Sequence, residues 1–579
     1  MIGPDVIPLQ ISGGSDTDLQ NLTANDLMKW GLANLWEEGR EGGYAVRHGQ
    51  QPVRDFPSME SNMNFFERAF PILFPYGRGG PEAARPCCLS LQDHIRWTLR
   101  YHDRRFRKHE TFSFVVFGIL QKRQALGSAR LQMERRSFDR DTHILSRIRP
   151  HDLLKAQEQE MRQEPITDPA VKLLFSHIHA TAARVMGSDV ARYRNRSKMW
   201  STTVSLNPPS LWITINLSDL HDPIAQIFVG EKIDMDNFQQ SLGPTSEQRA
   251  RNIAADPYAA ASFFHFMIRC ILRSLFGIER SSYRVKAKTG LLGQISSYFG
   301  TVESQGQGSL HLHMQVWLED APTSSRMHEM LQDEHFRSRV CKYIDANIHA
   351  YIPGVESSTS VKTIQNEIDI GYGRALNPDD TFFSIKNQEL EYQVARAKQI
   401  HKCEVGTCLV ADKHGRLRCK RHAPFPCFPT SFIDCDGNWG PKRDYEFLNA
   451  WMPSISISAR CNNDIKLLTN GKDTKDCTFY TTTYASKDQN KSHNLSAITT
   501  REFAYQEVRP KQEHTLKEQQ RLLLFRLVNR INSEQELSGP MVISLLMGWG
   551  DRYNSHNYSV VYWSSFVSFL FSYFPNLQT

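Results

Sequence analysis

The sequence lacks several features that would place it in a common class. It has no G-x4-G-K-[ST] motif, which excludes the usual Walker-type ATP site. Residues 1–14 have neither a basic segment nor a long apolar core, so we expect no secretory leader. The apolar run 558–575 is broken by serines and rich in aromatic residues, so a buried segment is expected there rather than a membrane span. No internal repeat is visible.

The composition indicates a globular chain with a modest excess of positive charge. The 579 residues include 69 Lys+Arg and 62 Asp+Glu, which gives a net charge of +7. This balance is compatible with nucleic acid but does not require it. Apolar residues make up 40% and aromatic residues 11%, enough for substantial cores, and the length predicts roughly three or four domains. The 11 cysteines indicate a reducing compartment, where clustered cysteines bind metal more often than they form disulfides.

The stretch 301–320, TVESQGQGSLHLHMQVWLED, contains the clearest candidate site. In a strand, side chains alternate between faces, so His311 and His313 point the same way and could share one metal ion. Glu303 lies eight residues before His311, in a neighbouring apolar run. If the glycines between the two runs close a hairpin, Glu303 lies beside the histidines as a third ligand. The alternative is a strand with two ordinary polar positions.

The order of expected elements predicts an α+β fold. A strand is expected over 210–217, a helix over 257–276, and two further strands over 293–302 and 309–318. This order predicts a sheet covered by helices on one face. Residues 350–443 are expected to be irregular and Cys-rich. Other helices are expected over 91–101, 111–126, 137–162, 168–186, 321–350 and 514–532.

A second chemical motif is TFYTTTYASK, at 478–487. On a helix, Tyr480 and Tyr484 are one turn apart on the same face, and Lys487 lies a further turn along. Half-buried tyrosines of an amphipathic helix would explain the pattern. A phenol is also a competent nucleophile at phosphorus when a metal polarises the phosphate, so the motif combines with the histidine pair to suggest phosphoryl chemistry.

The segment HKCEVGTCLVADKHGRLRCKRH (401–422) has the spacing of a zinc site. Cys403, Cys408, Cys419 and His422 form a candidate Cys3His set around a ten-residue loop. His401 and Cys427 are alternative ligands. Free thiols are the competing interpretation.

Several stretches resemble the N-terminal initiator (Rep) region of Helitron rolling-circle transposases, the Helitron helicase-like domain, and the fungal members above all. They include LWITINLSDLHDPIAQ, YFGTVESQGQGSLHLHMQVWL and FYTTTYASK, and they follow the family order between about 64 and 570. These proteins are HUH endonucleases, named for the His-hydrophobe-His motif. A complete Helitron protein also has a helicase, whose ATP-site motif is missing here.

The resemblance implies a nuclear enzyme that nicks single-stranded DNA at transposon ends and transfers the strand through a 5′-phosphotyrosine. His311, His313 and Glu303 would bind Mg²⁺ or Mn²⁺. Tyr480 and Tyr484 would be the nucleophiles, Lys487 would stabilise charge on the phosphate, and the zinc would be structural. A separately encoded helicase is a candidate partner, and no membrane partner is expected. Candidate DNA contacts are Arg104, Arg105, Arg107, Lys108, Asn216 and Asp219. The alternative is an inactive, transposon-derived DNA-binding protein.

The resemblance also implies a domain order around an HUH-like antiparallel sheet covered by helices. A lead-in over 1–60 would precede a helical DNA-binding region over 61–190. The endonuclease core would cover 191–500, with a zinc-binding insertion at about 395–445, and a helical segment would follow over 501–579.

Overall fold

The structure is a computed structural model that describes most of the chain from residue 65 to residue 578. The positions left out after residue 64 are 84–85, 88, 136, 281–284, 305–307, 358–359, 361–368, 407, 413–414, 469–473, 486–494, 509–514, 561–562 and 579. The lead-in expected over 1–60 therefore lies outside the described residues. Among the described helices, none combines the length and the apolar character that a membrane crossing needs.

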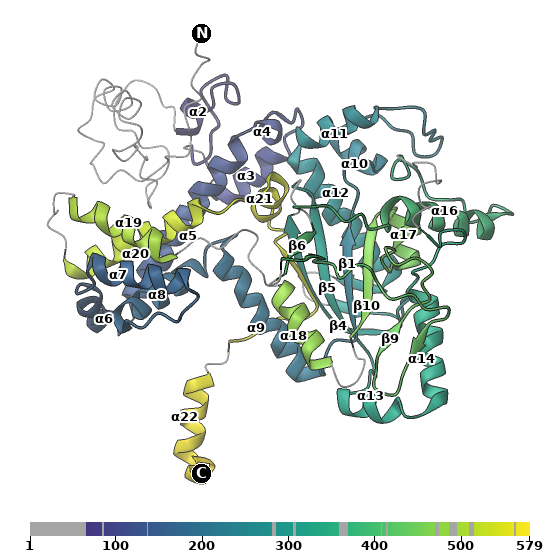
Figure 1. Cartoon of the computed structure of the whole chain (residues 1–579). Coiled ribbons are helices and arrows are strands. Elements are labelled where there is room, and N and C mark those ends of the chain that lie inside the picture. The colour runs from purple at the N-terminus through teal and green to yellow at the C-terminus, as the bar shows by residue number, and fades with distance from the viewer. Residues whose placement is uncertain are drawn as a thin grey trace.

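A five-stranded antiparallel sheet forms the centre of the fold (Figure 1). The strand order is β10-β1-β5-β4-β11, and each neighbouring pair is antiparallel. The strands are β1 (Leu211–Asn216), β4 (Ile295–Ser304), β5 (Leu310–Leu318), β10 (Asn462–Leu467) and β11 (Arg552–Asn554). The expected α+β class with an antiparallel sheet is thus confirmed.

The two faces of this sheet differ in chemistry, because side chains alternate along each strand. On β5, Leu312, Met314 and Val316 are fully buried in the main core. Helix α12 (Pro257–Cys270) packs into the same core, and its run AAASFF supplies small and aromatic side chains for close packing. The alternate β5 residues His311, His313 and Gln315 form the opposite, polar face. Helices α9 (Asp189–Leu206) and α18 (Thr474–Ala485) lie against that face.

A second core lies in a helical region on one side of the sheet (Figure 1). Helices α5 (Phe112–Met133), α6 (Phe138–Leu145), α7 (Pro150–Met161) and α8 (Pro169–Ala182) form it together with α19 (Leu495–Val508) and α20 (Leu516–Ser533). Leu524 and Leu527 of α20 are fully buried against residues such as Phe138 and Leu174. Residues from the last sixth of the chain therefore complete the core of the N-terminal helices.

The region expected to be irregular contains a regular helix. Helix α16 (Phe383–Lys398) has Val394 and Ala395 on one face, and both are buried against Leu448 and Trp451. Most other residues of α16 are polar or charged, so the sequence gives little sign of this short apolar stripe. The prediction of irregular structure throughout 350–443 was wrong for these sixteen residues.

Other differences from the expected elements affect the site directly. Strand β4 continues to Ser304, two residues past the expected end at 302, so Glu303 lies within the strand. Helix α9 and the edge strands β10 and β11 were not expected, since α9 is strongly basic and β11 has only three residues. The long helix expected over 137–162 is two helices, which separate before Pro150.

The remaining elements complete the outer layers. They are α2 (Phe65–Ala69), α3 (Leu91–Leu99), α4 (Arg105–Lys108), α10 (Pro223–Val229), α11 (Ser246–Ala254), the π-helical turn η2 (Ile271–Leu275), β2 (Ile278–Arg280), β3 (Val285–Ala287), α13 (Ser324–Met330), α14 (Glu334–Asn347), β6 (Leu409–Ala411), β7 (Leu417–Cys419), β8 (Phe432–Ile433), β9 (Trp439–Gly440), α17 (Pro453–Ala459), α21 (Gly539–Leu546), α22 (Trp563–Tyr573) and the 3-10 helix η3 (Pro575–Gln578).

Candidate metal centre

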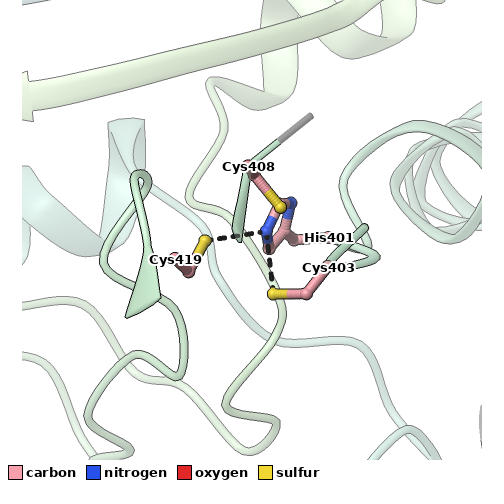
Figure 2. Close-up of side chains that lie close together, drawn as sticks. All are labelled: His401, Cys403, Cys408 and Cys419. Carbon is pink, nitrogen blue, oxygen red and sulfur yellow. Dashed lines mark hydrogen bonds between the residues drawn. The ribbon is translucent and has the colours of Figure 1, made fainter. Parts of the chain in front are cut away.

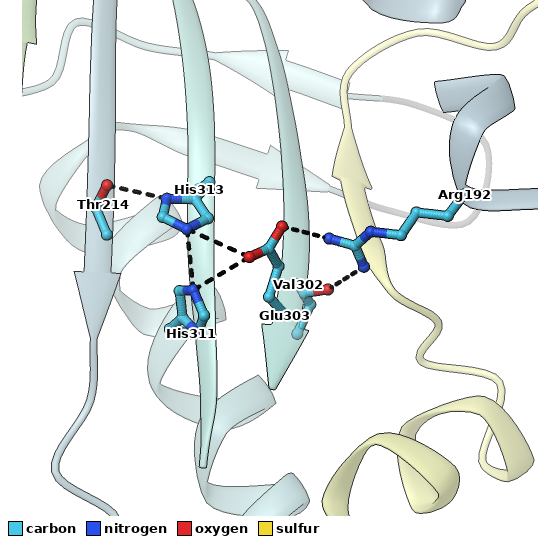
Figure 3. A network of polar contacts seen from close by, with 6 residues as sticks. All are labelled: Arg192, Thr214, Val302, Glu303, His311 and His313. Atoms are coloured by element: carbon cyan, nitrogen blue, oxygen red, sulfur yellow. Dashed lines mark hydrogen bonds and ion pairs between the residues drawn. The ribbon is translucent and has the colours of Figure 1, made fainter. Parts of the chain in front are cut away.

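The two histidines of β5 and a glutamate of β4 meet on the polar face of the sheet. The strand register places Glu303 directly opposite His311. The Nε2 atoms of His311 and His313 are 2.9 Å apart. Glu303 Oε2 lies 3.5 Å from His311 Nε2 and 3.7 Å from His313 Nε2. Figure 3 shows that the three groups point toward one another from adjacent strands. The hairpin pairing expected from the sequence is therefore present.

Arg192 of α9 holds the glutamate from the opposite side (Figure 3). Its guanidinium donates to Glu303 Oε1 at 2.6 Å and to the carbonyl oxygen of Val302 at 2.9 Å. The Arg192 side chain is 3% exposed and that of Glu303 is 18% exposed, so water screens this ion pair little. Burial acts to raise the pKa of Glu303, but the hydrogen bond with His311 and the charge of Arg192 outweigh it and lower the pKa. Oε1 is thus engaged by arginine while Oε2 faces the histidines.

Strand β1 fixes the orientation of His313. Thr214 Oγ1 lies 3.0 Å from His313 Nδ1. The indole of Trp212 stacks on the imidazole, with the ring centroids 5.4 Å apart and the planes inclined by 12°. Burial, followed by the neighbouring His311, lowers the pKa of His313 to about 3, so its imidazole is neutral at pH 7. A neutral ring whose Nδ1 is hydrogen-bonded presents the Nε2 lone pair to a ligand.

The donor set fits a divalent metal ion. The two imidazole nitrogens and the carboxylate oxygen all lie within 4.8 Å of one another. Two Nε2 lone pairs at such close range repel unless a proton or a cation lies between them. Three protein ligands would leave coordination positions open for a substrate, as in catalytic sites. Imidazole and carboxylate together suit several transition ions, so the geometry does not favour Mg²⁺.

Helix α18 carries the tyrosine motif across the same face of the sheet, but it turns Tyr480 away from the strands. Gln315 Nε2, on the metal side of β5, donates to Thr481 Oγ1 at 2.8 Å and to Thr482 Oγ1 at 3.2 Å. The two threonines are buried, whereas Tyr480 is 60% exposed. Because successive helical residues are 100° apart, Tyr480 lies roughly 140° around the helix from the buried stripe. The Tyr484 side chain and Lys487 lie outside the described residues.

The candidate DNA-binding cluster on α4 is divided between the interior and the surface. Arg104 donates to the carbonyl oxygen of Val229, and Arg107 forms a buried ion pair with Asp256, 2.8 Å from Nη2 to Oδ2. A phosphate contact by these two arginines does not agree with their inward position. Lys108 is exposed.

The remaining DNA-binding candidates lie on the partly exposed part of α4 and at the end of β1. Arg105 is partly exposed and pairs with Asp103 at 2.6 Å. Asn216 is the last residue of β1, on the face that carries Thr214. Asp219 is buried and accepts a hydrogen bond from Ser309 at 2.9 Å. Asn216 lies level with the histidine pair, since Ile215 pairs with Leu312, and Asp219 contacts Ser309, two residues before His311.

A second candidate metal site lies in the Cys-rich region (Figure 2). Its members, all within 4.8 Å of one another, are His401, Cys403, Cys408 and Cys419. His401 Nε2 lies 3.2 Å from Cys419 Sγ and 3.3 Å from Cys403 Sγ, as Figure 2 shows. Burial, with the neighbouring Cys419, raises the pKa of Cys403 to about 11, so a cation is needed to hold this thiol as a thiolate at neutral pH. Three sulfurs and one imidazole make a set that could bind zinc.

The fourth ligand expected at this site is corrected by the structure. His401, which the sequence offered as an alternative, takes the place expected for His422. The backbone N–H of His401 donates to the carbonyl oxygen of Phe447 at 2.7 Å, which holds this buried histidine beside the thiols. His422 has a φ of 62°, in the left-handed region, and is exposed outside the cluster. Cys427 is also exposed and outside the cluster.

Several residues around the two sites were missed by sequence reasoning. Arg192, Trp212 and Thr214 act on the metal ligands from other elements, and Gln315 anchors α18. Gln315 carried a usable signal, since it continues the polar alternation of His311 and His313 along β5. No signal identified Arg192, which is one of several arginines in a basic stretch.

Comparison with known proteins covers the first of these two sites. No curated protein matches the chain. Residues 94–316 match the family described as the Helitron helicase-like domain at the N-terminus. The match begins within α3 and ends within β5, so it includes Arg192, Glu303 and both histidines but not the cysteine cluster or α18. Over residues 94–316 the chain is therefore similar to the Helitron helicase-like domain family, and this similarity suggests a relation to transposases and replication initiators.

Proposed function

We propose that the protein is a Helitron-type replication initiator that nicks and transfers single-stranded DNA with the help of a divalent metal ion. The observation that carries this proposal is the convergence of Glu303, His311 and His313 on one buried face. A histidine pair on a central strand of a five-stranded antiparallel sheet also fits the HUH-endonuclease arrangement. The family match over residues 94–316 is consistent with the same function.

The residues around the triad would position a metal ion and set its charge. Arg192 offsets the charge of Glu303, so the ligand set would be close to neutral and an ion would keep most of its positive charge for a phosphate. Thr214 and Trp212 would hold His313 in its ligating tautomer. When bound, the ion would supply Lewis-acid polarisation of the scissile phosphate. Two imidazoles and one carboxylate suit Mn²⁺ better than Mg²⁺, which prefers oxygen ligands.

The covalent step is a transfer from the DNA backbone to a tyrosine. The phenol oxygen of Tyr480 or Tyr484 would form a bond to phosphorus while the bond to the 3′ oxygen breaks. The phenol proton would be lost to solvent, and the leaving 3′ oxygen would take up a proton. Lys487 would stabilise negative charge on the phosphate. Since Tyr480 faces away from the sheet, α18 would have to turn or shift before attack, and its hydrogen bonds to Gln315 would break.

The proposal is tested by mixing the protein with Mn²⁺ and single-stranded DNA that carries the element's end. The expected product is a protein–DNA adduct that survives denaturant. It should disappear in the double variant Tyr480→Phe/Tyr484→Phe and in His311→Ala. Matched controls are Tyr193→Phe, an exposed tyrosine on α9, and His335→Ala, an exposed histidine on α14; both should form the adduct normally. Cleavage without an adduct would contradict the tyrosine mechanism, and the absence of both products would contradict the whole proposal.

A second candidate function is a DNA-binding protein without nuclease activity. The outward position of Tyr480 favours it, because no chemistry at the triad uses a phenol on that side of α18. This candidate predicts tight binding of the same DNA in the same assay, with neither cleavage nor adduct.

A further inference from the structure

A cavity of about 650 Å³ lies at the end of the β4–β5 hairpin, where Gly308 and Ser309 line it. Its walls come from the start of α5, the start of α12, the start of α21 and the loop after β1. These helices pack together at one end of the sheet (Figure 1). Residues that line it include Lys108, Phe114, Asp219, Ala255, Ser309 and Ser538.

The cavity is connected to both strands that carry the metal ligands. Ser309 lies two residues before His311 in the chain. Ser538 Oγ lies 2.8 Å from the hydroxyl of Ser304, which follows Glu303 in β4 and faces the opposite side of the sheet, so this wall meets the hairpin from the core side. Two extended residues span at most about 7 Å. Through Ser309, a nucleotide next to a phosphate at the triad would therefore reach the cavity around the end of the sheet.

The walls combine an aromatic ring with donors for a phosphate. Phe114 is 45% exposed, an unusual state for a phenylalanine in the first turn of a long helix. The N-terminus of α5 has no side-chain cap, so its first N–H groups and its positive dipole end are available to an anion. Lys108 also lines the cavity and is exposed. Proteins that bind single-stranded nucleic acid commonly combine aromatic side chains, on which bases stack, with basic and N–H groups that contact the phosphates.

The polar atoms deeper in the cavity suit the edge of a base. Asp219 lies in the wall, is 8% exposed and accepts from Ser309 at 2.9 Å. Burial raises the pKa of Asp219. Glu110 also lines the cavity and is exposed, so the wall is not uniformly basic. A carboxylate and a hydroxyl can pair with the donors of a base, whereas a bare phosphate cavity would avoid acidic groups.

We propose that this cavity holds one nucleotide of the single-stranded DNA next to the scissile phosphate. Its base stacks on Phe114, its edge meets Ser309 and Asp219, and its phosphate lies near Lys108 and the start of α5. This inference rests on the proposed function for the identity of the ligand, but it concerns binding and does not depend on cleavage. It assigns a DNA-positioning function to Lys108, Phe114 and Asp219, which lie far from the triad in sequence.

Photocrosslinking tests the cavity directly. The probe is a 20-nucleotide thymidine oligomer in which 5-iododeoxyuridine replaces some thymidines, and crosslinked peptides are identified by mass spectrometry. We expect a crosslink in the peptide that contains Phe114. Phe114→Leu should remove it and weaken binding of the oligomer, measured by fluorescence anisotropy, on the order of ten-fold. The matched control Phe382→Leu changes an exposed phenylalanine outside the cavity and should have no effect.

A second variant fills the cavity without removing the aromatic ring. Ala255 is exposed in the wall, so Ala255→Trp should fold normally and weaken binding by a similar factor. Ala346→Trp, at an exposed alanine of α14, is the control. Crosslinks confined to other peptides, or unchanged affinity in both cavity variants, would overturn the inference. If the protein nicks DNA but the crosslinks lie outside the cavity peptides, the cavity inference is refuted and the proposed function stands. If the Phe114 peptide is crosslinked but the DNA is not nicked, the proposed function is refuted and the cavity inference stands.

Discussion

Replacing Arg192 by methionine should destabilise the fold, because it leaves the Glu303 carboxylate in a shielded site without its cationic partner. Removing one member of a buried ion pair costs about 3–5 kcal/mol. Glu303 retains 18% exposure, which places the expected loss near the lower end, at about 3 kcal/mol. The carbonyl of Val302 also loses its donor, which adds about 1 kcal/mol. We therefore expect Arg192→Met to lower the free energy of unfolding of the sheet region by about 4 kcal/mol.

A double-mutant cycle separates the ion pair from the lost packing. In Arg192→Met/Glu303→Gln the uncompensated charge is absent, so the double variant should be about 2 kcal/mol more stable than the sum of the single variants predicts. Urea unfolding followed by tryptophan fluorescence measures each free energy, since Trp212 stacks on His313 beside the pair. Additive effects of the two substitutions would refute the interpretation that Arg192 acts through Glu303.

Metal binding supplies an independent check on the same pair. In Arg192→Met, a divalent ion at the triad would partly compensate the isolated carboxylate. Saturating Mn²⁺ should therefore restore more stability to Arg192→Met than to the wild-type protein. Equal stabilisation of both proteins by Mn²⁺ would show that the ion does not reach Glu303.

Three further predictions concern other parts of the chain. His401→Ala should lose the zinc that the purified wild-type protein retains, measured by elemental analysis, whereas His422→Ala should keep it; the reverse result would support the ligand set expected from the sequence. Burial lowers the pKa of His265 to about 3, below the unfolded value of 6.5, so the unfolded state binds more protons and stability falls as the pH drops below 6.5. The loss at pH 5 should be about 2 kcal/mol and should vanish in His265→Gln, measured by urea unfolding at several pH values; an unchanged slope would contradict this. Arg107→Met should cost about 3 kcal/mol because its aspartate partner is fully buried, while Lys108→Ala should leave stability unchanged and lower the salt dependence of DNA binding by about one ion; equal stability of both variants would contradict the inward position of Arg107.

The part of the site that could be predicted from sequence depends on local geometry. The alternation of a strand places His311 and His313 on one face, and a short hairpin places Glu303 opposite them. Both steps need only the spacing of residues within twenty positions. The antiparallel β4–β5 pair follows from the same local patterns, whereas the antiparallel sheet as a whole was expected from the family resemblance.

The parts that could not be predicted depend on contacts between distant segments. Arg192 reaches Glu303 across 111 positions, and nothing in its own helix distinguishes it from Arg194 or Arg196. Tyr480 and Tyr484 do share a helix, but which side of α18 meets the sheet is decided by Thr481, Thr482 and Gln315. The spacing of a motif fixes a stripe on a helix; tertiary packing decides what that stripe faces.

At the cysteine site, too, the ligands could not be predicted from their spacing alone, although all the candidates lie close together in sequence. Ligand spacing within 401–422 offered two histidines at opposite ends of the segment. His401 lies beside the thiols with its backbone hydrogen-bonded to Phe447, whereas His422 has a left-handed backbone and lies outside the cluster. Neither the partner nor the left-handed backbone has a strong local signature.

The proposed metal site is tested most directly by the nitrogen ligands of a bound Mn²⁺ ion. Electron spin echo envelope modulation of the Mn²⁺-loaded protein detects coordinating imidazoles individually. Wild-type protein should give modulation from two histidine nitrogens, and His311→Ala and His313→Ala should each give modulation from one. Mn²⁺ bound without imidazole modulation, or a wild-type signal that neither substitution changes, would contradict a metal site at Glu303, His311 and His313.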